Sequence, residues 1–160
     1  TTGDPNNPDF ALQVGEQRSR GVEAETSWQA SDRAFLTGGL AFIDAAITGS
    51  NDGDVGNRLG NIPRLQANVW AHLQVHRNLV AGAGTNFVGR RFGTISNTYE
   101  LPRYGTVDAS LSWQVSRELK AEVFVQNLFD RTYYTGNSNN ALYLGEPRSA
   151  YVRLRANVGR

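Results

Sequence analysis

The chain has 160 residues, enough for one domain with a sizeable hydrophobic core. Its net charge of +1 gives no overall field that would favour nucleic acid, so we expect no nucleic-acid partner. Cysteine is absent, which excludes disulfide frameworks, thiolate zinc sites and cysteine catalysis.

Apolar and polar residues alternate along nearly the whole chain, whereas helical periodicity is almost absent. This pattern predicts an all-β fold. No stretch approaches the roughly 18 consecutive apolar residues of a membrane helix, although strands that cross a membrane need no such stretch. We expect about eight strands, at residues 9–14, 18–30, 34–47, 64–76, 79–92, 104–115, 119–129 and 149–159.

The second predicted strand contains two arginines on an otherwise apolar side. Arg18 and Arg20 share the parity of Val22 and Trp28, and arginine on a lipid-facing side is costly at mid-membrane. We interpret Gly21 as a β-bulge that moves the arginines to the other face. The alternative is that both arginines lie beyond the apolar band.

The predicted strand 64–76 shows the alternation most clearly. One face carries Ala, Val and Leu, and the other carries Gln66, Asn68, Trp70, His72, Gln74 and His76. Strands of soluble proteins cluster near about 5–6 residues, whereas several here have 11 to 14, and a tilted strand crosses a bilayer in about 9–11. A soluble sandwich would also alternate, so length favours a membrane wall without excluding a soluble sheet.

The next predicted strand contains the glycine-rich segment LVAGAGTNFVG, residues 79–89. Its glycine spacing matches neither a dinucleotide-binding turn nor a P-loop. Glycine in this strand permits the close approach of another backbone or a bend.

Short and long connections alternate along the chain. The short ones are expected near residues 31–33, 77–78 and 116–118, and the long ones near residues 48–63, 93–103 and 130–148. Up-and-down barrels of outer membranes have short periplasmic turns and long outer loops, which a Greek-key sandwich does not. We therefore predict an antiparallel up-and-down transmembrane β-barrel with extracellular long loops and a periplasmic C-terminus. The short connection near 15–17 fits this scheme poorly.

Candidates for catalysis or metal binding are weak. Glu23 and Glu25 lie about 7 Å apart on one strand face, a spacing that overlaps with hydrolytic carboxylate pairs, yet lumen carboxylates paired with arginine are commoner. His72 and His76 lie roughly 13 Å apart, too far to share a metal. NDGDVGN at 51–57 lacks the closing glutamate of a calcium loop. We predict no catalytic residue, no metal site and no enzyme.

Two long connections combine tyrosine, asparagine, serine and arginine. They read GTISNTYELPRY at 93–104 and RTYYTGNSNNALYLGEPR at 131–148. Such mixtures suit adaptable polar and aromatic recognition. The commoner interpretation is that the loops are simply polar and that their tyrosines form an interfacial girdle.

The chain resembles the C-terminal part of the TonB-dependent outer-membrane receptors, particularly those for siderophores. Five stretches, in matching order and spacing, carry the resemblance: VGEQRSRGVEAE (14–25), NIPRLQANVW (61–70), FVGRRF (87–92), VFVQNLFDRTYY (123–134) and LGEPRSAYVRLRANV (144–158). VFVQNLFDRTYY looks like the family's penultimate strand, with Val123 and Val125 facing lipid. Asn127 to Asp130 would then form the corner at which the strand leaves the bilayer.

The resemblance implies one segment of a barrel of about 22 strands that encloses a plug domain. Neither a plug nor the motif that engages TonB is found, so residues 1–160 are predicted to be a C-terminal barrel segment alone. The implied location is the bacterial outer membrane. The implied partners are outer-membrane lipid, a ferric siderophore or related small ligand, the remaining barrel and plug, and TonB through the plug.

The same resemblance implies uptake of the ferric chelate without catalysis and with no cofactor, iron being present only within the bound chelate. Ligand specificity would reside in side chains of the lumen and loops. The candidates are Arg90, Arg91, Tyr99, Tyr133 and Tyr134.

Two other classes of protein stay open from the residues alone. The first is a self-contained eight-strand membrane barrel, which would pair residues 9–14 with 149–159. The second is a soluble barrel of the lipocalin type, in which the Ala, Val and Leu faces would point inward. Dependence on detergent would separate the second from the membrane proteins.

Overall fold

The computed structural model describes residues 2–4, 7–12, 15–138 and 141–157. No helix in these ranges is long and apolar enough to cross a bilayer. The strands are β1 (Thr2–Asp4), β2 (Asn7–Leu12), β3 (Gly15–Ser31), β4 (Ala34–Ser50), β5 (Leu65–His76), β6 (Leu79–Val88), β7 (Arg91–Phe92), β8 (Glu100–Leu101), β9 (Tyr104–Gln114), β10 (Leu119–Gln126), β11 (Tyr134–Ser138), β12 (Ala141–Leu144) and β13 (Ser149–Ala156).

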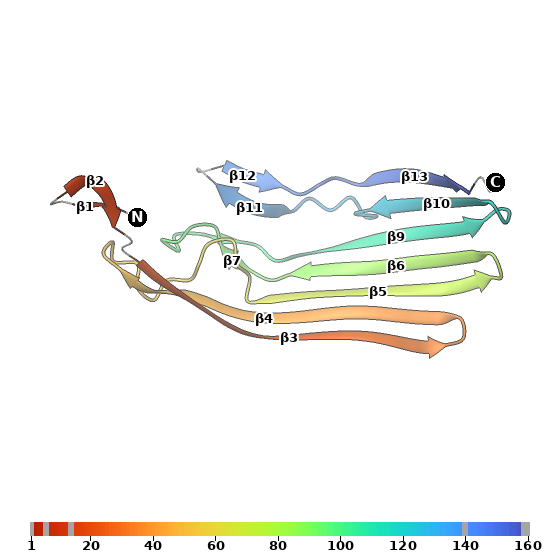
Figure 1. The fold of residues 1–160 in the computed structure, drawn as a ribbon, viewed down its shortest axis with the longest axis horizontal. Coiled ribbons are helices and arrows are strands. Elements are labelled where there is room, and N and C mark those ends of the chain that lie inside the picture. Colours follow the sequence, from red (N-terminus) through yellow and green to blue (C-terminus); the bar gives the residue numbers. More distant parts are fainter. Residues whose placement is uncertain (1, 5–6, 13–14, 139–140, 158–160) are drawn as a thin grey trace.

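Seven strands form one antiparallel sheet, here called the wall, in the order β13-β10-β9-β6-β5-β4-β3. Figure 1 shows them side by side, each joined to its neighbour at one end. The remaining short pairs, β7–β8 and β11–β12, lie within long connections. The predicted up-and-down arrangement and its strand positions are therefore confirmed for seven of the eight expected strands.

The predicted strand 9–14 does not join the wall. Its described part belongs to β2, which pairs with β1 instead, and residues 13–14 lie outside the described residues. Within the described chain β3 and β13 each have a single neighbour. The pairing of 9–14 with 149–159 that would close an eight-strand barrel is thus not found among the described residues, where β2 pairs with β1 alone.

The two faces of the wall differ in polarity. Cross-strand pairing aligns one apolar row of six residues: Ala34, Leu73, Ala81, Leu111, Val123 and Val152. Val152 is 67% exposed and Leu154 on the same face is 69% exposed. A continuous apolar face open to its surroundings is suited to lipid, and we call it the outer face. The lipid-facing placement predicted for Val123 agrees with this row.

The opposite side of the wall, here called the inner face, is polar and aromatic. The row next to the one above contains Phe35, His72, Gly82, Ser110, Phe124 and Tyr151. This difference follows directly from the period-2 alternation of the sequence, since paired residues in neighbouring strands point to the same side.

The predicted bulge at Gly21 is wrong. The pairing of β3 with β4 runs without a shift from Gln17 to Gln29. β4 stops pairing with β5 at Phe42, and Arg18 and Arg20 pair with β4 residues beyond that level, which agrees with the alternative. Gly21 is needed for a different reason, because a Cβ there would lie 2.5 Å from the Phe42 carbonyl oxygen.

Candidate functional site

The long connections gather at one end of the wall and the short turns lie at the other (Figure 1). We call residues 51–64, 89–103 and 127–148, apart from 139–140, the loop cluster. It contains several of the most deeply buried side chains among the described residues, and most of these are polar. Because buried polar groups need partners, their contacts determine how the loops are held.

Arg91 joins two of these connections. Its side chain is 2% exposed, and its Nη2 donates a hydrogen bond of 2.6 Å to the Tyr134 carbonyl oxygen. Its guanidinium carbon lies 5.6 Å from the centre of the Tyr104 ring, a cation–π geometry. Burial lowers the pKa of Arg91 from its usual value, yet an arginine stays charged at neutral pH.

Two asparagines join the first connection to the third. Asn61 Nδ2 donates to the Asn137 carbonyl oxygen at 2.9 Å, and the Asn137 N–H donates to Asn61 Oδ1 at 2.9 Å. Asn137 Nδ2 also donates to the Gly93 carbonyl oxygen at 3.2 Å. The three connections are therefore tied to one another by directed hydrogen bonds, which the sequence did not reveal.

The corner predicted at Asn127 to Asp130 directly follows the end of β10 at Gln126. Asn127 and Asp130 have left-handed backbone, with φ of 47° and 52°. Asn127 Nδ2 donates to the carbonyl oxygens of Arg131 and Glu146 at 2.9 and 3.0 Å. Its Oδ1 accepts the Arg131 N–H at 2.9 Å. One side chain thus fixes both ends of the third connection where it leaves the wall.

The five predicted ligand-binding residues all lie in the loop cluster. Arg90 is exposed and 4.0 Å from a Glu100 oxygen, and Tyr99 is 37% exposed. Arg91, by contrast, is enclosed and its side chain donates a hydrogen bond to the third connection. Ligand contact by any of these residues stays a prediction.

Tyr133 and Tyr134 are half-buried within the third connection. The Tyr133 ring lies 4.4 Å from the Tyr104 ring and packs so closely on Gly145 that a Cβ there would collide with it. Burial and the neighbouring Tyr104 hydroxyl raise the pKa of Tyr133. Both tyrosines therefore contribute packing to the loop cluster, whatever else they contact.

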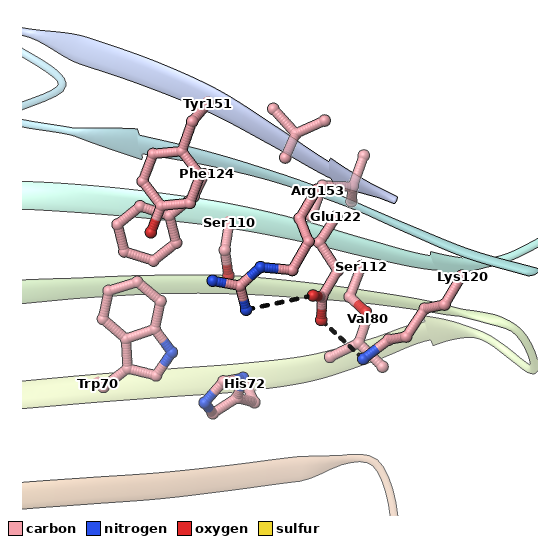
Figure 2. A pocket seen from close by; sticks show the side chains of 12 residues that line it. Trp70, His72, Val80, Ser110, Ser112, Lys120, Glu122, Phe124, Tyr151 and Arg153 are labelled. Carbon is pink, nitrogen blue, oxygen red and sulfur yellow. Dashed lines mark hydrogen bonds and ion pairs between the residues drawn. The ribbon is translucent and has the colours of Figure 1, made fainter. Parts of the chain in front are cut away.

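A second candidate region lies on the inner face of the wall. A groove of about 480 Å³ is lined there by Trp70, Phe124 and Tyr151, together with charged side chains from β10 and β13 (Figure 2). Trp70 and His72 were expected on the polar side of their strand, but the groove was not predicted. Strand alternation alone cannot show that residues from β5, β10 and β13 meet.

The structure gives no further support to the weak candidates for catalysis or metal binding among the described residues. His72 faces the groove, whereas His76 Nδ1 lies 2.6 Å from Asn78 Oδ1 at the β5–β6 turn. No group of three or more metal-ligating side chains occurs in the described ranges. The recorded ion pairs of those ranges include neither Glu23 nor Glu25, so the arginine partners expected for them are not found.

A sheet with one apolar face open to its surroundings and one polar face suits the wall of a membrane β-barrel. The family model described as "TonB dependent receptor-like, beta-barrel" matches residues 1–128. The chain belongs to the TonB-dependent receptors, a family of outer-membrane receptors and transporters rather than enzymes. The resemblance drawn from the sequence is confirmed, and a lipocalin-like barrel is no longer supported.

Named relatives agree with this membership. The chain is 35% identical over 98% of its length to the metal-pseudopaline receptor CntO of Pseudomonas aeruginosa and covers 23% of that receptor. The siderophore receptor PiuA of Acinetobacter baumannii superposes with a TM-score of 0.79 at 25% identity, over 88% of this chain and 22% of PiuA. For the ferric yersiniabactin receptor FyuA of Yersinia pestis the TM-score is 0.78 at 26% identity, over 89% of this chain and 24% of FyuA. The chain therefore spans about a quarter of the length of these proteins.

Proposed function

We propose that this chain forms part of the barrel wall of an outer-membrane receptor that takes up a ferric siderophore or a similar metal chelate. The observation that carries the proposal is the 35% identity with a metal-chelate receptor along 98% of the chain. The wall suits this role, since its outer face is apolar and its inner face is polar. The chelate would bind from the lumen and loops, and TonB would drive uptake through the plug.

The proposed orientation places the loop cluster outside the cell and the short turns in the periplasm. β13 runs from the loop cluster toward the short-turn end, which would leave the C-terminus periplasmic. The free edges of β3 and β13 would pair with the remaining strands of the barrel, because an unpaired edge of this length invites aggregation.

The proposal is tested by uptake in a strain that lacks the complete receptor. Cells complemented with it would be offered one panel of chelates loaded with radioactive iron and another loaded with cobalt, nickel or zinc. We expect accumulation of at least one chelate, lost when TonB is deleted. A receptor that assembles correctly but neither binds nor imports any chelate of the panel would contradict the proposal.

Within the loop cluster, Arg90 and Tyr99 are proposed to contact the chelate directly, because they are open to solvent. Arg91, Tyr133 and Tyr134 would act on binding by keeping the loops in place. Arg90→Gln should weaken chelate binding, whereas Arg117→Gln, an exposed arginine at the opposite end of the wall, should leave it unchanged. Equal chelate affinities for the two variants would contradict a direct contact between Arg90 and the chelate.

A further inference from the structure

Three asparagines of the loop cluster have left-handed backbone. They are Asn61, Asn97 and Asn127, with φ of 62°, 55° and 47°. Asn61 lies in the connection after β4, Asn97 in the one after β6 and Asn127 in the one after β10, and we call these the first, second and third connections. Asparagine tolerates this backbone better than most residues. Each connection therefore has one such asparagine, and two of the three side chains reach another connection.

The side chain of Asn97 joins the second connection to the first. The Arg58 N–H donates to Asn97 Oδ1 at 2.8 Å, and Asn97 Nδ2 donates to the Arg58 carbonyl oxygen at 2.8 Å. Asn61 joins the first connection to the third in the same way, with two bonds of 2.9 Å to the backbone of Asn137. Each side-chain amide thus exchanges two hydrogen bonds with one residue, as a residue of a paired antiparallel strand does.

Two buried side chains join the third connection back to the second. Asn137 Nδ2 donates to the Gly93 carbonyl oxygen, and Arg91 Nη2 donates to the Tyr134 carbonyl oxygen. The second connection is therefore tied to the first, the first to the third and the third to the second, which makes a closed ring. All of these bonds join residues of this chain, so the ring does not depend on which surfaces are exposed.

The first and second connections also pack backbone against backbone. The Asn61 N–H donates to the Phe92 carbonyl oxygen at 2.7 Å. A Cβ on Gly60 would lie 3.1 Å from the backbone carbonyl carbon of Thr94. Because the two backbones approach so closely, neither connection can shift far without displacing the other.

We propose that the three connections form one cooperative unit that opens only as a whole, with Asn61 and Asn97 as the positioning residues that join them. In a closed ring, a connection that leaves must break its bonds to both of the others. Local opening of one connection therefore carries the cost of disrupting all three, which is how segments of a protein come to open together. Arg90 and Tyr99 on the second connection are then held in place by the first and third connections as well.

The test is hydrogen–deuterium exchange of the complete receptor in detergent micelles, without any chelate. Asn97→Gly and Asn61→Gly keep the left-handed backbone, so each removes only the bonds of its side chain. Asn97→Gly separates the first connection from the second, yet exchange should also rise about fivefold in β11 of the third. Asn61→Gly separates the first connection from the third, yet exchange should rise by a similar factor at residues 93–101 of the second.

Asn78→Gly is the matched control at the opposite end of the wall, where Asn78 Nδ2 donates to the Gln114 carbonyl oxygen at 3.1 Å. It removes the same kind of bond and should leave exchange in the loop cluster unchanged. Heat-modifiable gel migration would verify that each variant assembles, and either asparagine variant alone tests the proposal.

An increase confined to the two connections that a variant separates would overturn the cooperative unit, and so would unchanged exchange in the whole loop cluster. The measurement needs no chelate, so its outcome is independent of the proposed function. A receptor that imports no chelate but shows the shared increase would contradict that function and leave the cooperative unit in place.

Discussion

The wall and the loop cluster of this receptor segment are built on different principles. In the wall nearly every side chain reaches the outer or inner face, and large apolar residues such as Val152 and Leu154 stay open to their surroundings. In the loop cluster Leu101 is buried, and so are the polar side chains of Arg91, Asn127 and Asn137. The usual order of apolar interior and polar surface is thus absent from the wall.

The difference has a physical cause. Ladder hydrogen bonds satisfy the backbone of the wall, and its outer face needs only a lipid environment. The loops have few ladders, so their backbone groups need side-chain partners such as Asn127 and Asn61. The wall should therefore be destabilised most by substitutions that change the polarity of a face. The loop cluster should be destabilised most by substitutions that remove a hydrogen-bonding side chain.

The largest effect is expected for Asn127→Ala. It would leave the Arg131 N–H and the Arg131 and Glu146 carbonyls without their present partner, at about 1–3 kcal/mol for each group that stays buried. It would also place alanine at a φ of 47°. Hydrogen–deuterium exchange should rise throughout 127–138 and 141–148 while wall strands stay protected.

Asn127→Gly is the control for that variant, because glycine tolerates the left-handed backbone. It should retain the loss of hydrogen bonds and remove only the strain. If exchange in the third connection is unchanged in both variants, the side chain of Asn127 does not order the loop.

The wall is tested by Val69→Arg, on the outer face near the middle of β5. A lipid-facing arginine at that depth should cost about 2–4 kcal/mol. Asn68→Arg, one residue away on the inner face, should cost far less. Urea unfolding of the receptor in lipid vesicles gives both values, and equal losses would mean that the two faces are not distinguished by lipid.

A smaller effect is expected for Gly84→Ala. Its Cβ would collide with Trp70 and lie 2.8 Å from the Val69 carbonyl oxygen, and overpacking of this kind costs about 1–3 kcal/mol. Gly105→Ala is matched on the neighbouring β9, where the nearest atom would be 3.4 Å away. The midpoint of urea unfolding should fall only for Gly84→Ala. Unchanged midpoints for both would show that Trp70 moves aside freely.

The smallest effect should come from Arg90→Gln. Arg90 forms an exposed pair of 4.0 Å with Glu100, and such pairs contribute about 0–1 kcal/mol. Its neighbour Arg91 should be more sensitive, because Arg91→Gln removes a buried charged donor from the Tyr134 carbonyl. Thermal unfolding of the two variants would measure both losses of stability. A larger loss for Arg90→Gln than for Arg91→Gln would contradict the prediction.

Local patterns predicted what depends on neighbouring residues alone. Strand positions followed from the two-residue period, and β5 was expected at 64–76 and found at Leu65–His76. The corner after β10 was expected from the family resemblance of VFVQNLFDRTYY, and its Asn127 and Asp130 have left-handed backbone, which these residue types tolerate. In the glycine-rich strand a close backbone approach or a bend was considered, whereas at Gly84 the nearest group is the Trp70 indole.

Other features needed the tertiary structure. Gly21 suggested a bulge, yet it accommodates a carbonyl of the next strand. Residues 9–14 alternated like a wall strand, but the described part of this segment pairs with β1 and not with the wall. Arg91 was predicted to bind the ligand. In the structure it is enclosed and its side chain donates a hydrogen bond to the third connection.

The strands, the polarity of the two wall faces and the family could be predicted from the amino-acid order, because alternation and short motifs are local properties. The loops that hydrogen-bond to one another and the rings that meet on the inner face could be found only in the folded chain. Asn61 and Asn137 are 76 residues apart in the chain, and Trp70 and Phe124 lie on strands separated by β6 and β9. Contacts over such distances depend on several strands and loops together, which the pattern of a single segment does not show.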